Sequence, residues 1–260
     1  MSRGRERGAA LLAAVTTLAV LAVVALGFAS TAIVDAQLAT NMLQALQAEA
    51  LARSGVAATV VVLGARDPLE PDLANARWGS GRQPLGAGTV DVTVEDEARR
   101  LDVQAPELPQ LLAVLGIAPR LATALAAPDP ERLLGPSLGD RARAARLDRD
   151  AARRLAAFVG TSGEPRVNPN TASREVLLAL THDAPLVDGW LRARTRGLVE
   201  PSAIPADLAD RFTTRGQYYR VRAVGRVGEI RRAVEAVVQV LGDVEPAVVS
   251  WRPVSAGDDA

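Results

Sequence analysis

An uncharged and strongly apolar run over residues 9–34 constrains this chain more than any other feature of its sequence. No ionisable residue lies between Arg7 and Asp35. A helix rises about 1.5 Å per residue, so this run would reach roughly 39 Å, more than the ~30 Å hydrocarbon core of a bilayer. The run therefore predicts a transmembrane helix over residues 9–34.

A cleaved secretory signal peptide is the alternative interpretation of this run. Small residues at 28–30 and 31–32 would suit a signal peptidase. The apolar region of a signal peptide spans only about 7–15 residues, however, and this run is longer. The length favours a retained anchor and leaves the signal peptide open as the alternative.

The charges on the two sides of the run predict its orientation. Arg3, Arg5 and Arg7 outnumber Glu6 before the run. Because positive residues flanking a membrane helix stay in the cytoplasm, the body after Asp35 should lie outside it.

Residues 35–63 favour a continuation of the same helix beyond the membrane. The segment has no proline and is rich in Ala, Leu and Gln. Its apolar residues recur at spacings of three and four, as in an amphipathic helix: Leu38, Met42, Ala45, Leu46 and Ala50. The alternative is a break at Ser54-Gly55 and a separate short helix.

The body combines strand patterns at its two ends with helical patterns between them. After a polar loop over 64–88, residues 89–103 alternate valine with polar residues and predict a strand, a turn at 96–99 and a second strand through Leu101 and Val103. Residues 217–241 predict two antiparallel strands, with a helix as the alternative for the second run, and 247–254 predict a last strand.

The middle of the chain is helical in character. Residues 105–160 are rich in Leu and Ala and are interrupted by prolines, and the charges of 138–160 indicate a solvated helix face. Residues 166–194 predict a helical hairpin, with Asn170 or Thr171 as the cap of a first helix from Ala172 and a second helix over 186–194. Its inner face would carry Val176, Leu177 and Leu180.

Gly8, directly before the apolar run, resembles the leader of type IV prepilin-like proteins. The resemblance implies that a prepilin peptidase cuts between Gly8 and Ala9 and methylates the new amino terminus. Most members carry a glutamate at the fifth mature position, which here is Ala13. That glutamate neutralises the terminal ammonium of a neighbouring subunit, so its absence suits the first subunit of a filament.

The missing glutamate, together with the order of the other segments, resembles the type II secretion minor pseudopilin K (GspK) family. Asp96-Glu97 stand where that family has an acidic pair after a strand, and VNPNTA at 167–172 resembles its Asn-rich segment. The terminal strand with Trp251 also matches. Two departures are Arg99-Arg100 with Asp102 in place of a Gly-Lys and Asn-rich step, and a short 105–165 region.

The resemblance implies an α+β pseudopilin fold: a long amino-terminal transmembrane and amphipathic helix packed on an antiparallel sheet, with an inserted mainly helical subdomain. The expected parts are a leader (1–8), a transmembrane helix (9–34), the helix continuation with a loop and first strands (35–104), the insertion (105–212) with its helix-hairpin-helix-like segment (166–194), and the terminal strands (213–260).

The implied function is that of a minor pseudopilin at the pseudopilus tip, which starts or caps assembly for export across the outer membrane. The expected partners are the I-type and J-type minor pseudopilins, prepilin peptidase and the lipid of the bacterial inner membrane, with the body in the periplasm. K-type proteins also resemble calcium binders. No loop here shows a regular spacing of oxygen ligands, so calcium remains a candidate without assigned ligands, and no other cofactor is expected.

The sequence offers no convergent set of catalytic groups. It has no cysteine, its single histidine, His182, lies in an expected surface turn, and it contains no Walker loop, nucleophile elbow or His-Glu-x-x-His motif. Asp96 and Glu97 are adjacent and are expected to mark a turn rather than an acid/base pair. We therefore expect no enzymatic activity and no catalytic residue.

The rival hypothesis is a membrane-anchored helix-hairpin-helix DNA receptor of a competence system. Such hairpins grip phosphate with a Gly-x-Gly turn, whereas residues 181–185 read THDAP. Arginines and acids also balance over 164–200, and the net charge of the chain is zero. The charge balance does not favour nucleic acid as a partner.

Overall fold

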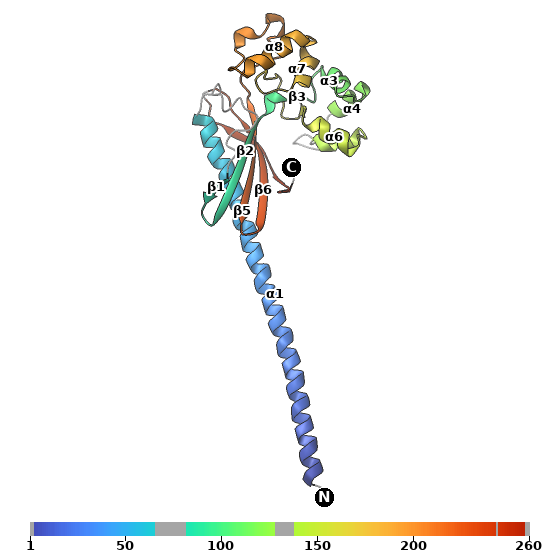
Figure 1. The fold of residues 1–260 in the computed structure, drawn as a ribbon, viewed down its shortest axis with the longest axis vertical. Coiled ribbons are helices and arrows are strands. Elements are labelled where there is room, and N and C mark those ends of the chain that lie inside the picture. The colour runs from blue at the N-terminus through green and yellow to red at the C-terminus, as the bar shows by residue number, and fades with distance from the viewer. Residues whose placement is uncertain (1–2, 66–81, 128–137, 243, 258–260) are drawn as a thin grey trace.

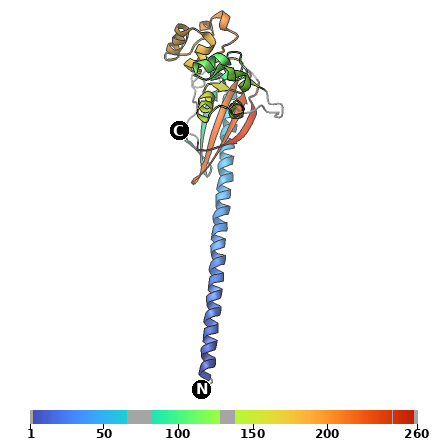
Figure 2. The ribbon, with the colours of Figure 1, turned by 90° about the vertical axis from the view of Figure 1, so that its right-hand side faces the viewer.

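A computed structural model describes residues 3–65, 82–127, 138–242 and 244–257. A single helix, α1 (Arg3–Ala65), forms a long stalk whose last part joins a head (Figure 1). The head contains a sheet beside α1 and a group of short helices beyond the end of that sheet, as both views show (Figures 1 and 2).

Helix α1 is continuous through the segment where a break was the alternative. Ser54 donates a hydrogen bond from its hydroxyl to the carbonyl of Ala50, at 2.9 Å, so its side chain turns back onto the helix. An ion pair of 2.6 Å joins Glu49 to Arg53, one turn apart, which supports the same stretch. The prediction of one long helix is confirmed.

The sheet has five antiparallel strands in the order β1-β2-β5-β6-β7. Its members are β1 (Arg82–Leu85), β2 (Gly88–Asp96), β5 (Tyr218–Val227), β6 (Ile230–Gln239) and β7 (Ala247–Val254). The strands expected after residue 88 and in the last part of the chain are confirmed. The expected loop over 64–88 is wrong at its end, because residues 82–85 form the edge strand β1.

One stripe of α1 packs on this sheet. Its buried side chains recur at helical spacings of three and four: Ala48, Ala52, Val56, Thr59 and Leu63. They meet the inward side chains of the sheet, among them Val90, Val221, Ala236 and Val238. The stripe that the sequence indicated is a different one: Leu38, Met42 and Leu46 are exposed. Leu38 and Met42 precede the part of α1 that meets the sheet, and Leu46 faces away from it.

Two glycines allow this close approach. A β-carbon on Gly225 of β5 would lie 1.9 Å from the carbonyl oxygen of Ala48, and one on Gly55 would lie 2.7 Å from the Cγ2 atom of Val90. Helix and strand therefore touch backbone to backbone, and Gly55 serves packing rather than a helix break.

The inserted part consists of short helices around a second apolar core. They are α3 (Leu108–Val114), α4 (Ala122–Ala126), α5 (Leu138–Ala144), α6 (Arg149–Ala156), α7 (Arg174–Thr181) and α8 (Ala184–Arg194). Short 3-10 turns lie at η1 (Glu97–Arg99), η2 (Pro119–Leu121), η3 (Pro201–Ala203) and η4 (Ala206–Leu208). Leu111, Leu125, Leu155, Leu177 and Trp190 belong to the core.

The second strand expected after the acidic pair exists but does not return along the first. Strand β3 (Leu101–Asp102) pairs in parallel with β4 (Val159–Gly160) in a sheet of its own. The turn at η1 redirects the chain out of the main sheet, because Asp96 caps it by accepting a hydrogen bond from the Ala98 amide at 2.9 Å. β3 therefore leads into the insertion.

The charged segment 138–160 is not one solvated helix. It divides into α5 and α6 near Arg146, which has a positive φ of 56°. Arg141 is buried, and its guanidinium donates to the carbonyls of Leu125 and Ala127 at 2.9 and 2.7 Å. This arginine ties α5 to the end of α4, so the solvated-face interpretation is wrong for Arg141.

We predict that Gly225→Ala loosens the contact between α1 and the sheet. The added methyl overlaps the Ala48 carbonyl, so helix and strand must separate, at a cost of about 1–3 kcal/mol in the free energy of unfolding. Urea unfolding in detergent, followed by circular dichroism, measures the change. The matched control is Gly189→Ala in α8, where no atom lies within 4 Å of the new methyl. An equal loss in both variants would contradict the packing role of Gly225.

Candidate functional site

The apolar part of α1 has no protein partner within the chain. From Val15 to Val34 its large apolar side chains are 48% exposed at Val24 and up to 75% at Leu26 and Phe28. Among the described residues, α1 is the one helix that is long and apolar enough to cross a membrane. Because it is exposed, this segment differs from the core helix of a soluble domain and needs lipid or other helices around it.

The expected processing residues lie at the far end of this stalk from the head. Gly8, Ala9 and Ala13 fall within α1 by backbone conformation, and their side chains lie outside the described part. The structure brings none of them near the head (Figure 1). Cleavage after Gly8 and the role of Ala13 remain predictions.

A buried polar cluster joins the sheet to the insertion. Asp96, at the end of β2, is 2% exposed. Its Oδ2 atom accepts hydrogen bonds from Asn168 Nδ2 at 2.9 Å and from Thr171 Oγ1 at 2.8 Å. Both donors belong to the Asn-rich segment before α7, so a single carboxylate holds that segment against the sheet.

Glu97 binds back to the sheet. Its Oε1 atom accepts from Arg220 of β5 at 2.6 Å and from Arg100 at 2.7 Å. Burial alone would raise the pKa of Glu97, but the charges of Arg220 and Arg100 outweigh it, and the pKa is lowered. Arg220 also reaches Glu235 on β6 at 3.2 Å, so the ion pairs extend across the sheet.

A third buried acid lies in the same region. Glu164 is 3% exposed, and its Oε2 atom accepts from the Gln217 amide at 2.8 Å. Burial raises its pKa, and the charge of Asp96 raises it further. Burial likewise raises the pKa of Asp96, and burial followed by the charges of these two acids raises the pKa of Tyr219.

The sequence located the acidic pair and the Asn-rich segment but did not join them. Asp96-Glu97 do mark a turn, as expected, yet both are buried. The expected caps of α7 are wrong: Ser173 is the cap, since Thr171 serves Asp96 and Asn170 accepts from the Val199 amide at 2.7 Å. The available signal was the position of the two acids directly after a valine-rich strand. The end of such a strand lies close to the core, so acids there could have been predicted to be buried.

The helical hairpin α7–α8 is confirmed, and its turn contradicts a phosphate grip. Asp183 caps α8 by accepting from the Leu186 amide at 3.0 Å, so a carboxylate occupies the place where a phosphate would bind. Arg174 pairs with Asp188 at 3.0 Å, and Arg194 donates to the carbonyls of Pro169 and Ala172. This geometry argues against a DNA receptor.

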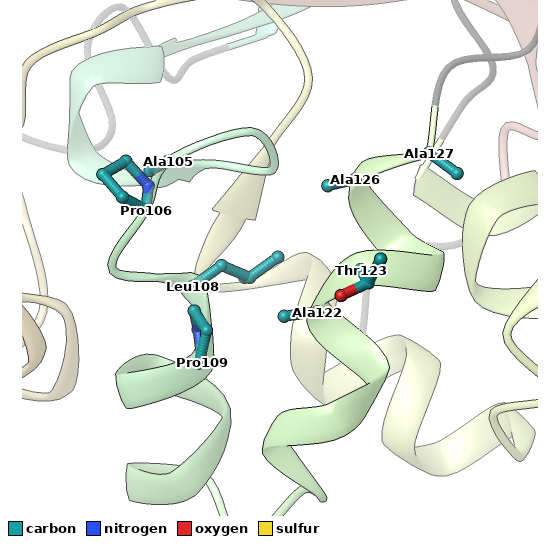
Figure 3. Close-up of a pocket in the computed structure, with 8 residues that line it drawn as sticks. All are labelled: Ala105, Pro106, Leu108, Pro109, Ala122, Thr123, Ala126 and Ala127. Carbon is teal, nitrogen blue, oxygen red and sulfur yellow. The ribbon is translucent and has the colours of Figure 1, made fainter.

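An apolar cavity of about 550 Å³ lies between α3 and α4. Alanine, proline and leucine line it, together with Thr123 (Figure 3). The lining offers no titratable group for catalysis. Within the described residues no three His, Asp or Glu side chains are placed to hold a metal ion, so calcium gains no ligand set there. His182 is exposed at the hairpin turn.

Comparisons with known proteins place this architecture. No protein-family model matches the chain, and no curated protein matches it significantly. A chain of the crystal structure of the GspK-GspI-GspJ complex from the enterotoxigenic Escherichia coli type 2 secretion system matches with a TM-score of 0.56 at 15% identity. The match covers 86% of this chain and 99% of the other. The fold is a pseudopilin fold. The predicted fold class is thereby confirmed, since the stalk helix, sheet and helical insertion all agree.

We predict that Glu164→Gln changes how stability depends on pH. A raised folded-state pKa means that the native state binds more protons than the unfolded state. The extra proton on Glu164 therefore contributes stability that is fully present below the pKa of Glu164 in the unfolded state. This stability is lost as the pH rises through the pKa of Glu164 in the folded state. Because glutamine does not titrate, the variant does not lose this stability at high pH, and its side-chain oxygen can still accept from the Gln217 amide. Its free energy of unfolding, relative to the unmutated chain, should be higher at about pH 8 than at about pH 4.

Urea titrations at both pH values measure this difference. The unmutated chain, measured in the same buffers at both values, is the reference. A Glu164→Gln variant whose relative stability does not change with pH would show that the Glu164 carboxyl titrates alike in both states.

Proposed function

We propose that the chain is a minor pseudopilin of a type II secretion system. The carrying observation is the exposed apolar stretch of α1, continuous with a helix that packs on the sheet of a pseudopilin fold. A soluble domain gains nothing from such a stalk, whereas a filament subunit needs it to lie in the membrane before assembly and to pack on other helices afterwards.

The proposed position is the pseudopilus tip. Ala13 supplies no carboxylate for the terminal ammonium of a subunit ahead of it. The insertion lies beyond the end of the sheet that is opposite the stalk, where the head of a subunit ahead would have to stack (Figure 2). Both features favour a subunit that starts or caps the filament, with I-type and J-type minor pseudopilins as its neighbours.

The proposed processing and location follow from the leader. Prepilin peptidase would cut between Gly8 and Ala9 and methylate the new terminus, leaving α1 in the inner membrane. Arg3, Arg5 and Arg7 would keep the leader in the cytoplasm and the head in the periplasm. The head would act by assembly, without an enzymatic reaction of its own.

The first test is the intact mass and amino-terminal sequence of the protein from membranes of cells with and without prepilin peptidase. We expect a product that starts at methylated Ala9 and that disappears when the peptidase is absent. A product that starts near Ile33 would make the apolar run a discarded signal peptide. A chain that keeps Met1 in both strains would exclude the pseudopilin proposal as well.

The second test concerns the tip. Ala13→Glu supplies the missing carboxylate, so the variant should enter the shaft of the pseudopilus as well as its end. Immunogold labelling of sheared filaments counts the subunits at the end and along the length. Ala14→Glu adds the same charge one position away and should stay at the end. Unmutated protein distributed along the shaft would contradict the tip assignment.

A further inference from the structure

The turn between β5 and β6 is the part of the head that lies next to the emerging stalk (Figures 1 and 2). A β-carbon on Gly228 in this turn would lie 3.5 Å from the side-chain amide of Gln44. Gln44 is nine residues above Asp35, the first charged residue after the apolar run, and nine residues of helix rise about 13 Å. The turn therefore lies close to the level at which α1 leaves the membrane.

Three arginines surround this turn. Arg226 and Arg231 lie directly opposite each other on β5 and β6, and Arg232 follows. Arg231 and Arg232 are exposed, and Arg226 is half-buried. Glu229 in the turn is the one acid over residues 226–232. We call residues 226–232 the basic turn.

These arginines differ from those farther along the same sheet. Arg220 and Arg252 form ion pairs with Glu97 and Glu235. In the described part of the chain, no ion pair involves Arg226, Arg231 or Arg232, and the Nε atom of Arg226 is buried without a hydrogen-bond partner. Like charges directly opposite on two strands destabilise a sheet. An external anion would offset that cost.

The membrane surface lies within reach of the basic turn. A run of about 39 Å centred on a ~30 Å hydrocarbon core places Asp35 among the headgroups, which extend to a total thickness of about 40–45 Å. The basic turn then stands about 10 Å above the headgroups, roughly one Debye length at physiological salt. Membrane helices are tilted by about 20° on average. A tilt of α1 toward the side that carries the basic turn brings the turn closer to the membrane, so that the long arginine side chains reach the surface.

We infer that the basic turn binds anionic phospholipid headgroups of the leaflet from which the head emerges, and thereby holds the head down on the membrane. The inference rests on the membrane anchoring in the proposed function. Leu85, 41% exposed at the end of β1 and at the same end of the sheet, offers the bilayer an apolar side chain near the arginines. A head docked in this way has to be released before it can be raised on a filament.

The test uses the full chain in lipid nanodiscs. Because the chain has no cysteine, one fluorophore can be placed with Ala87→Cys, at the exposed β1–β2 turn beside the basic turn. A headgroup spin label quenches the fluorophore when the head is docked. We expect stronger quenching in discs with 30% phosphatidylglycerol than in pure phosphatidylcholine, and we expect about 0.5 M salt to weaken it. A label at Ser202→Cys, in η3 of the insertion, should stay unquenched.

The variant that combines Arg226→Gln, Arg231→Gln and Arg232→Gln should release the head, because the equilibrium constant for docking falls about fivefold for each arginine removed. The matched control is Arg149→Gln, Arg153→Gln and Arg154→Gln on α6, which changes the net charge equally and should leave quenching unchanged. The salt dependence of the unmutated head keeps the test valid if the first variant folds poorly.

Three results would overturn the inference. Equal quenching in the two lipids would show that charge does not hold the head, and full quenching in the variant of the basic turn would exclude these arginines. Quenching that appears only after an I-type or J-type pseudopilin is added would assign the basic turn to a protein partner. Failure of the chain to insert into discs at all would instead refute the membrane anchoring, and with it the proposed function.

Discussion

The contact between the last turns of α1 and the sheet is the constraint on which the rest of the molecule depends. One helix has to satisfy two environments: its first part exposes large apolar side chains, and its last part buries Ala48, Ala52 and Val56 against valines and alanines of the sheet. Small residues at the contact, with Gly55 and Gly225, bring the backbones together. The head is thereby joined to the stalk by direct packing of helix on sheet.

The insertion is attached to the head by buried polar groups rather than by a continuous apolar core. Asp96 and Glu97 are adjacent in the chain but face opposite parts of the molecule, one toward the Asn-rich segment and the other toward Arg220 of the sheet. Hydrogen bonds and ion pairs fix direction where apolar contact would allow sliding. A buried charge that loses its partner is costly, so this arrangement holds the insertion in a single orientation.

This architecture is consistent with a protein whose function is assembly. Within the described residues, two features without a partner stand out, the apolar surface of the stalk and the arginines of the basic turn, and the basic turn lies at the end of the head from which the stalk extends. The acids of the junction are, in contrast, partnered within the head. These two surfaces are the ones on which the proposed anchoring in a bilayer and the proposed assembly depend.

The sequence by itself determined the elements whose signal is local. The uncharged run, the absence of proline over 35–63 and the alternation of β2, β5 and β6 each predicted an element correctly, because periodicity and propensity act over neighbouring residues. The hairpin α7–α8 and the terminal strand β7 were also recognised. The order of these segments was enough to indicate the fold class.

Only the tertiary structure decided which residues meet across long separations. The sequence indicated Leu38, Met42 and Leu46 as the packed stripe of α1, but the sheet begins above Met42 and meets the face of the helix opposite Leu46, and its position depends on strands at the other end of the chain. The sequence pattern predicted only a turn at Asp96, whereas in the structure its carboxylate is buried and accepts hydrogen bonds from Thr171 and Asn168. Local pattern shows that a residue is polar or apolar, but burial depends on what the fold places beside it, and that was settled here by pairings more than seventy residues apart.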